Sequence, residues 1–245
     1  MKIALIGYGK MGHIIESIAL SRGHQVVCII DKDNHNDFES EAFASADVAI
    51  EFTTPQTAEA NICRAWKANI PVVCGTTGWD VEEFRSKYLE LKTTLNCTNG
   101  TTEQPFCGLM WSSNYSIGVN ILFALNQQLA KFMEAYPNYT PHLTEVHHIH
   151  KLDAPSGTAK TLQAAIGDHR LAVSNIESIR EGEVPGIHTV IWDSSVDTIS
   201  ISHSAKSREG FALGAVIAAE WMKGKTGWHE FCEVLDTTLH NTKQH

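Results

Sequence analysis

The sequence predicts an α/β protein of two domains, one with a mainly parallel sheet and one of α+β type with a mixed sheet. In the first half of the chain, strand-like and helix-like segments alternate, which indicates parallel strands joined by helical crossovers. Between residues 177 and 203, three strand-like segments follow one another without a helix, which indicates mixed or antiparallel pairing. A hydrophobic fraction of 43% and a charged fraction of 19% are typical of globular domains.

The first half opens with a short apolar strand, Lys2–Gly7. From Lys10 to Ser21, apolar residues recur at the spacing of an amphipathic helix, which Gly23 is well placed to end. Asp80 and Glu83 have the spacing of a capping box and predict a helix that runs to about Leu91. The segments predicted in between are strands at Gln25–Ile30, Ala46–Phe52 and Pro71–Cys74, and a helix at Gln56–Lys67.

The second half begins near residue 112. A long helix is expected over Ile117–Tyr136, followed by a strand over Tyr139–Ile149 and a helix that starts after Ser156. The remaining predicted segments are strands at Glu177–Glu181, Ile187–Trp192 and Val196–His203, then helices at Phe211–Lys223 and Trp228–His240. We expect one domain over 1–113 and 212–245, with the last helices returning to it, and a second over 114–211.

The charge and cysteine content exclude several classes of protein. With 19 Lys+Arg against 28 Asp+Glu, the net charge is −9, which disfavours a nucleic-acid or membrane-surface partner. No apolar run reaches the roughly 20 residues of a membrane helix, and the chain opens on a strand rather than a signal peptide. The six cysteines form no CxxC pair, which disfavours a zinc ribbon. We therefore expect a reduced, cytoplasmic protein.

A glycine-rich motif joins the first predicted strand to the first helix. It reads GxGxxG and consists of Gly7, Tyr8, Gly9, Lys10, Met11 and Gly12. In a Rossmann-like domain such glycines permit the tight turn, the approach of a pyrophosphate and close helix packing, and the helix N-terminus attracts the phosphates. Asp31 ends the second strand, where an acid binds the adenosine ribose. The motif predicts a dinucleotide site that favours NADH, while Lys32 leaves NADPH open.

Two further loops follow predicted strands of the same sheet. Phe52 begins one loop, and Gly75, Thr76 and Thr77 form the other. Ligands of open α/β sheets bind at the carboxyl ends of strands, so both loops are expected to border the nicotinamide. Ordinary strand-to-helix turns would give the same spacing.

The segment 145–158 concentrates ionisable side chains. Three histidines and two acids within nine residues would suit a metal, but His147 and His148 alternate on a strand, and we predict no metal site. Acid chemistry fits better, because His147 and Lys151 are four residues apart and a histidine donates protons near neutral pH. The run Ser156–Thr158 at a helix start is expected to hold a substrate carboxylate. A solvated polar strand is the alternative.

The run EVHHIHKLDAPSGTA at 145–159 resembles the signature of the 4-hydroxy-tetrahydrodipicolinate reductase family, also called dihydrodipicolinate reductases. The similarity extends over nearly the whole chain. It includes GYGKMG, EFTTP, CGTTG, SSNYSIGVN at 112–120, REGEVPGIHTV at 180–190 and HSAKSREGFALGA at 203–215. The histidine-rich run is the most specific of these motifs.

The resemblance implies a Rossmann-like cofactor domain and an α+β substrate-binding and oligomerisation domain with a mixed sheet, assembled as a homotetramer. It implies reduction of a small dicarboxylate by NADH or NADPH in lysine and diaminopimelate biosynthesis, with hydride transfer to ring C4. It implies that His147 is the proton donor and Lys151 a second one, and that His148, Gly157 and Thr158 contact the substrate. The cofactor contacts implied are Gly7–Gly12, Asp31, Gly75–Thr77, Ser112, Ser113, Asn114 and Tyr115.

Two other functions remain open at this stage. Another two-domain dehydrogenase acting on an amino or sugar acid would share the glycine motif, but would not need the histidine-rich run. A redox sensor that binds a dinucleotide without turnover would not need His147 and Lys151. The polar segment 96–108 has no functional account and is expected to be a surface loop.

Overall fold

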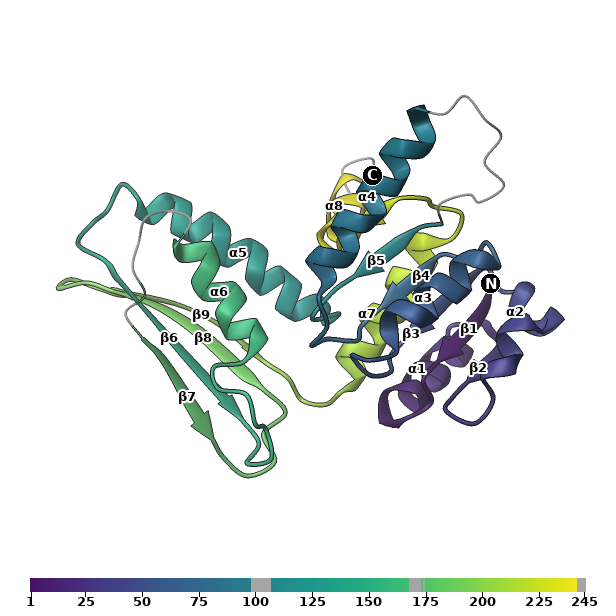
Figure 1. Cartoon of the computed structure of the whole chain (residues 1–245). Helices are drawn as coiled ribbons and strands as arrows, with labels where there is room; N and C mark the ends of the chain where they lie inside the picture. Colours follow the sequence, from purple (N-terminus) through teal and green to yellow (C-terminus); the bar gives the residue numbers. More distant parts are fainter. Residues whose placement is uncertain (98–106, 168–172, 174, 242–245) are drawn as a thin grey trace. The chain divides into compact units, whose positions relative to one another are not determined.

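The computed structural model describes residues 1–97, 107–167, 173 and 175–241 (Figure 1). The chain divides into two compact units, the first formed by Met1–Tyr115 with Phe211–His245 and the second by Ser116–Gly210. The greater part of segment 96–108 lies outside the described residues. In the described part of the chain, no helix is both long enough and apolar enough to span a membrane.

The first unit contains a sheet of six parallel strands in the order β10-β5-β4-β3-β1-β2. The parallel α/β class predicted from the sequence is thereby confirmed. Its strands are β1 (Lys2–Ile6), β2 (Gln25–Ile30), β3 (Val48–Glu51), β4 (Val72–Cys74), β5 (Leu109–Trp111) and β10 (Trp228–His229). Its helices are α1 (Lys10–Ser21), η1 (His35–Glu39), α2 (Glu41–Ala44), α3 (Ala58–Lys67), α4 (Val81–Cys97), α7 (Glu209–Met222) and α8 (Cys232–Asn241).

The prediction of one helix over Trp228–His240 was wrong. Trp228 and His229 pair with Leu109 and Met110 and add β10 to the sheet. Helix α8 begins only at Cys232, where the Glu233 carboxylate accepts a hydrogen bond from the backbone N–H of Glu230 at 2.8 Å. Strand β5 was not predicted, and α4 continues to Cys97 rather than ending near Leu91.

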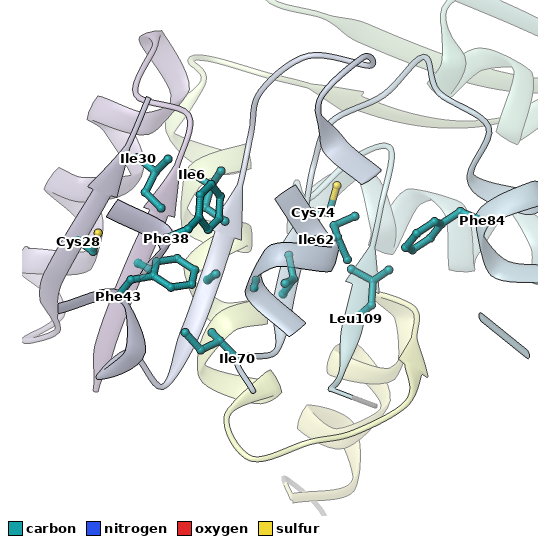
Figure 2. Packing of buried hydrophobic residues seen from close by; sticks show 14 residues of the cluster. Ile6, Cys28, Ile30, Phe38, Phe43, Ile62, Ile70, Cys74, Phe84 and Leu109 are labelled. Carbon is teal, nitrogen blue, oxygen red and sulfur yellow. The ribbon is translucent and has the colours of Figure 1, made fainter. Parts of the chain in front are cut away.

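The core of the first unit lies against both faces of short, fully buried strands. All four residues of β3 and all three of β4 are buried, which is why these segments are apolar without alternation, except for the acid Glu51 at the end of β3. Figure 2 shows the packing of one cluster, which includes Ile6, Ile30, Phe38, Phe43, Ile62, Ile70, Phe84 and Leu109. Each such side chain contributes about 1.5–3 kcal/mol on burial, and this rigid layer holds the loops at the strand ends.

The second unit contains a four-stranded mixed sheet in the order β7-β6-β8-β9. Its strands are β6 (Thr140–His147), β7 (Ile176–Arg180), β8 (Ile187–Asp193) and β9 (Thr198–Ser204), and its helices are α5 (Ile117–Met133) and α6 (Gly157–Gly167). β6 pairs with β7 in parallel and with β8 antiparallel, and β8 pairs antiparallel with β9. The predicted mixed sheet is confirmed.

The strand β6 alternates strictly between a buried and a more exposed face. Leu143 lies on the buried face and shares a core cluster with Leu122 of α5 and Leu162 of α6. Glu145 and His147 continue the same face, because side chains two residues apart point the same way on a strand. The apolar row thus ends in two buried ionisable side chains.

Candidate active site

The glycine-rich turn of the first unit has the geometry of a nucleotide-binding loop. Gly7 has a φ of +94°, and an ideal Cβ there would lie 2.1 Å from the carbonyl oxygen of Phe52. At Gly12 a Cβ would lie 2.5 Å from the carbonyl oxygen of Gly7. At Gly9 no atom lies within 4 Å of the ideal Cβ position, so the backbone is open to a ligand there. Close packing therefore requires glycine at positions 7 and 12, whereas Gly9 leaves the backbone accessible to a ligand.

The start of α1 is available to an anion. No side chain caps the helix at Gly9, and its first turn contains no acidic residue. Lys10 is exposed and Met11 half-buried, while the Tyr8 hydroxyl donates a hydrogen bond to the Glu16 carboxylate. Uncapped N–H groups and the helix dipole favour negative charge, so these residues fit a pyrophosphate.

Asp31 lies immediately after β2 and is exposed. Its Oδ1 accepts a hydrogen bond from the Lys32 backbone N–H at 2.9 Å, and its own N–H donates to Asn34 Oδ1 at 2.7 Å. These contacts orient an exposed carboxylate at a strand end, which is the arrangement that a ribose diol requires.

The loops after β3 and β4 are joined to each other. The backbone N–H of Thr53 donates to Thr76 Oγ1 at 2.8 Å, and an ideal Cβ on Gly75 would lie 2.2 Å from the Phe52 ring. The exposed Thr77 follows Thr76 in the second loop. The structure therefore brings together the two loops that the sequence placed at strand ends.

The segment 112–115 follows β5. The Ser112 hydroxyl donates to the Asn114 carbonyl oxygen at 2.8 Å, and Ser113 is exposed. Tyr115 is buried, and its hydroxyl, which has a single hydrogen to donate, lies 3.0 and 2.9 Å from the carbonyl oxygens of Cys74 and Met110. Burial raises the pKa of Tyr115 well above its ordinary value. Tyr115 thus connects strands rather than offering a free hydroxyl to a cofactor.

A buried carboxylate at the end of β3 was missed by sequence reasoning. Glu51 has no exposed surface, and it accepts hydrogen bonds from the Thr53 hydroxyl and, at 3.0 Å, from the Cys74 thiol. It connects the ends of β3 and β4 under the two loops. The signal in the sequence is an acid at the end of the apolar run ADVAIEF.

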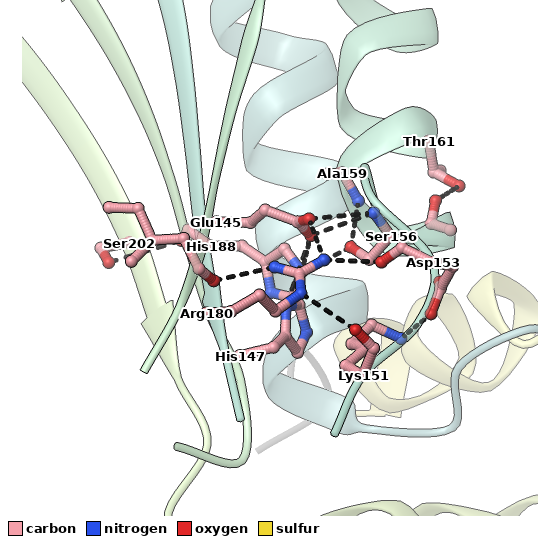
Figure 3. A network of polar contacts seen from close by, with 12 residues as sticks. Glu145, His147, Lys151, Asp153, Ser156, Ala159, Thr161, Arg180, His188 and Ser202 are labelled. Atoms are coloured by element: carbon pink, nitrogen blue, oxygen red, sulfur yellow. Dashed lines mark hydrogen bonds and ion pairs between the residues drawn. The ribbon is translucent and has the colours of Figure 1, made fainter. Parts of the chain in front are cut away.

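The second unit gathers its ionisable side chains from three strands and the start of α6 (Figure 3). Glu145 and His147 lie on β6, Arg180 on β7, His188 on β8, and Ser156 precedes α6. The rings of His147 and His188 lie 5.0 Å apart in an edge-to-face arrangement. Sequence reasoning found only the residues of the 145–158 run, because Arg180 and His188 come from separate strands.

Glu145 is the centre of this group and has no exposed surface. Both carboxylate oxygens lie 3.1 Å from the backbone N of Ser156, and Oε1 lies 3.1 Å from Arg180 Nη2. Oε2 lies 3.4 Å from His147 Nδ1 and 3.7 Å from His188 Nε2. Burial raises the pKa of Glu145, but the hydrogen bonds from Ser156 and Arg180 outweigh it and hold the pKa below its ordinary value.

The two buried histidines titrate below the usual range. Burial lowers the pKa of His147, and the nearby Glu145 carboxylate opposes that shift. For His188, burial followed by repulsion from His147 lowers the pKa to about 4. Gly186 permits this placement, because its ideal Cβ would lie 3.1 Å from His147 Nε2.

Lys151 lies just beyond the end of β6. Its Nζ lies 2.7 Å from Asp153 Oδ1, and its backbone N–H donates to the His148 carbonyl oxygen at 3.1 Å. The predicted strand to Ile149 was too long, because β6 ends at His147 and the chain turns there. His148 is half-buried, whereas His147 is buried.

Ser156, which the sequence placed in the expected carboxylate-binding run, is already engaged by other groups of the protein. Its N–H already donates to Glu145, and its hydroxyl accepts a hydrogen bond from the Ala159 backbone N–H at 3.2 Å and contacts His188 Nε2 at 3.1 Å. Gly157 is exposed, with no atom within 4 Å of its ideal Cβ, and Thr158 is half-buried. The exposed backbone at Gly157 is a part of this helix start that is suited to a substrate anion.

A metal would compete with existing contacts in this group. Ligand atoms of Glu145, His147 and His188 lie within 4.8 Å of one another. However, the Arg180 guanidinium already lies against Glu145 and supplies positive charge there. The donor set therefore suits proton chemistry better than cation binding.

Comparison with known proteins identifies the family. The N-terminal domain family of dihydrodipicolinate reductase matches residues 1–94, and the C-terminal domain family matches residues 118–235. A protein of Christiangramia forsetii named 4-hydroxy-tetrahydrodipicolinate reductase is 42% identical, with 98% of this chain and all of the relative covered. One of the same name from Thermosipho africanus is 33% identical, with 96% of this chain and 98% of the relative covered.

A solved structure has the same fold. The dipicolinate-bound dihydrodipicolinate reductase of Paenisporosarcina sp. TG-14 superposes with a TM-score of 0.72 at 19% identity. The superposition covers 94% of this chain and 97% of that one. Both halves of the sequence match the family, and the relatives are matched over nearly their whole length. The chain therefore belongs to the dihydrodipicolinate reductase family.

Proposed function

We propose that this protein catalyses the NAD(P)H-dependent reduction of 4-hydroxy-tetrahydrodipicolinate to tetrahydrodipicolinate, a step of lysine and diaminopimelate biosynthesis. The observation that carries the proposal is the grouping in the second unit of His147, Lys151 and the start of α6. Two proton donors next to backbone N–H groups suit a ring that bears carboxylates and must accept a proton during reduction.

The first unit binds NADH, NADPH or both in this proposal. Gly7–Gly12 receive the pyrophosphate, and Asp31 receives the adenosine ribose, which favours NADH. The loops at Phe52 and Gly75–Thr77 and the segment Ser112–Tyr115 border the nicotinamide. When bound, the cofactor would supply the hydride, which we assign to ring C4 after the 4-hydroxyl group has left as water, so that the ring gains one hydride and one proton.

The second unit supplies the proton and holds the carboxylates. His147 protonates the enamine carbon, and Lys151 acts as a second donor and stabilises developing negative charge. Because burial lowers the pKa of His147, its cationic form needs nearby negative charge. Glu145 provides part of it, and a dianionic substrate adds more, so substrate binding itself favours the protonated acid. His148 and the backbone at Gly157 and Thr158 bind the carboxylates.

A dicarboxylate substrate is supported by a relative. The Paenisporosarcina structure is described as dipicolinate-bound, and dipicolinate carries two ring carboxylates. The net charge of −9 belongs to the chain as a whole and does not describe this site, where Lys151 and Arg180 place two cationic side chains beside His147.

We also propose a cytoplasmic homotetramer. Both helices of the second unit lie on one face of its sheet (Figure 1), and the opposite face carries Thr144, Thr189 and Ser202. On this face Thr189 Oγ1 lies 2.8 Å from Ser202 Oγ. Pairing of two such faces would bury them both, and light scattering of the purified protein gives the subunit number directly.

The activity is tested by NADH oxidation at about 340 nm, the absorption band of the reduced nicotinamide. The substrate is generated in the cuvette by the dehydratase, and the assay is repeated with NADPH. Turnover that requires the dehydratase supports the proposed reaction. Absence of turnover with both cofactors, despite measurable NADH binding, would instead favour another dehydrogenase or a redox sensor.

A further inference from the structure

Glu145 contacts three separate parts of the candidate site. It lies on β6 and meets the Ser156 backbone N–H at the start of α6, Arg180 on β7 and His147 on its own strand. With no exposed surface, it is inaccessible to a substrate. A fully buried carboxylate is unfavourable unless cations and hydrogen-bond donors surround it. Glu145 therefore holds the groups that contact it in place.

Arg180 extends these contacts to the loop that carries Lys151. Its Nε lies 3.3 Å from the Lys151 carbonyl oxygen, and its Nη2 lies 2.5 Å from that of Asp153. The same Nη2 lies 3.1 Å from Glu145 Oε1. A guanidinium can make these contacts together because its N–H groups form a rigid, planar fork. One ion pair thus connects His147, the Lys151 loop and the start of α6.

We propose that Glu145 and Arg180 are positioning residues, which hold the proton donors His147 and Lys151 and the anion-binding start of α6 in one fixed arrangement. The inference rests on the proposed function, because positioning is meaningful only if these groups act on a substrate. Neither residue touches the reacting atoms in this account. Their effect should therefore appear in turnover and in its pH dependence more than in cofactor binding.

The pH dependence follows from the charges that face His147. Glu145 on β6 and Asp153 in the following loop favour the imidazolium, whereas Arg180 on β7 and Lys151 oppose it. His188 on β8 packs against the ring. Glu145 Oε2 lies 3.4 Å from His147 Nδ1, so removal of its charge makes His147 harder to protonate.

The test compares Glu145→Gln, Arg180→Lys and the control Glu177→Gln. Glu177 lies on β7 but is exposed, and its carboxylate meets only Thr144 among the contacts described. For each variant we would measure kcat and KM for 4-hydroxy-tetrahydrodipicolinate and the pH profile of kcat/KM. The Kd for NADH and the melting temperature complete the comparison.

Glu145→Gln should lower kcat about tenfold to a hundredfold, the scale of a misplaced proton donor. The descending limb of its pH profile should move toward acid by about one unit. Arg180→Lys keeps the positive charge but loses the planar guanidinium that makes several hydrogen bonds at once. It should therefore lower kcat without moving the descending limb of the pH profile. Kd for NADH should be unchanged in both, and Glu177→Gln should behave as the unmodified protein.

Unchanged kcat and an unchanged pH profile in Glu145→Gln would overturn the inference while the proposed reaction stood. So would a lower melting temperature with no change in kcat or profile, since that is the result of a merely structural residue. If Glu145→Gln does not fold, Arg180→Lys decides alone, because that side chain is partly exposed, and normal turnover there overturns the inference. An unmodified protein without reductase activity would instead overturn the proposed function.

Discussion

The carbonyl oxygen of Phe52 lies 2.1 Å from the position that a Cβ on Gly7 would occupy. The turn after β1 and the loop after β3 are therefore in direct backbone contact. This contact, with the φ of +94° at Gly7, leaves room for no side chain at that residue. It gives the glycine motif of the sequence a packing reason that is independent of any bound cofactor.

Gly7→Ala should destabilise the first unit, because backbone would have to move to admit the methyl group. The expected loss is about 1–3 kcal/mol or more, measured by thermal or urea unfolding. Gly9→Ala is the matched control, since no atom lies within 4 Å of its ideal Cβ. It should leave unfolding unchanged and weaken NADH binding. Equal stability of the two variants would contradict this account.

His147→Ala and Lys151→Ala should each lower turnover by about 10²–10³, the contribution of a general acid. NADH binding should stay close to normal, because both residues belong to the second unit. Stopped-flow or steady-state kinetics and NADH fluorescence titration measure the two effects. The comparison variant is His150→Ala, whose exposed ring pairs with Glu183 and should be dispensable. A variant that lost NADH binding but kept turnover would refute the roles assigned here.

Asp31→Ala should weaken NADH binding and leave NADPH binding nearly intact, because a 2′-phosphate does not use the carboxylate. The exposed neighbour Asp33 provides the control, as Asp33→Ala removes the same charge one residue beyond Lys32. The decisive quantity is the ratio of the Kd for NADH to the Kd for NADPH, determined for each variant. An NADH affinity that did not change in Asp31→Ala would remove this residue from the cofactor site.

Stability should fall as the pH falls from about 6.5 to about 4, the interval between the ordinary pKa of a histidine and that of buried His188. In this interval the unfolded chain binds a proton that the folded His188 does not, so acid favours unfolding. The effect of this one residue is about 3 kcal/mol if the full shift is expressed. Melting temperatures across this range should depend less steeply on pH in His188→Gln than in the unmodified protein.

Much of the fold could be predicted because long elements leave a periodic signal. The α1 helix and the strand β2 were located at their observed bounds. β5 and β10 were not found, because strands of three and two residues have no measurable period. The equally short β4 was found through its place in the alternation of strands and helices. β5 and β10 are strands only because β4 provides an edge for β5, and β5 one for β10.

The candidate site could be predicted only where it is local in sequence. His147, Lys151 and the start of α6 fall in one run, so their types and spacing suggested acid chemistry. Arg180 and His188 lie in the motif at 180–190, but the spacing within that motif assigns neither of them a role. They join the group through strand pairing, which places Arg180 opposite His147 and His188 opposite Glu145. Such pairing is a property of the sheet and not of either segment.

The edge strand β10 has a consequence for how the protein is made. It completes the first sheet with residues 228–229, which leave the ribosome after the whole second unit. A nascent chain that ends before them carries β5 as an unpaired edge, open to association with other chains. The first sheet is therefore completed only after the whole second unit has been synthesised. Truncation before β10 should yield an aggregating product rather than an independent nucleotide-binding fragment.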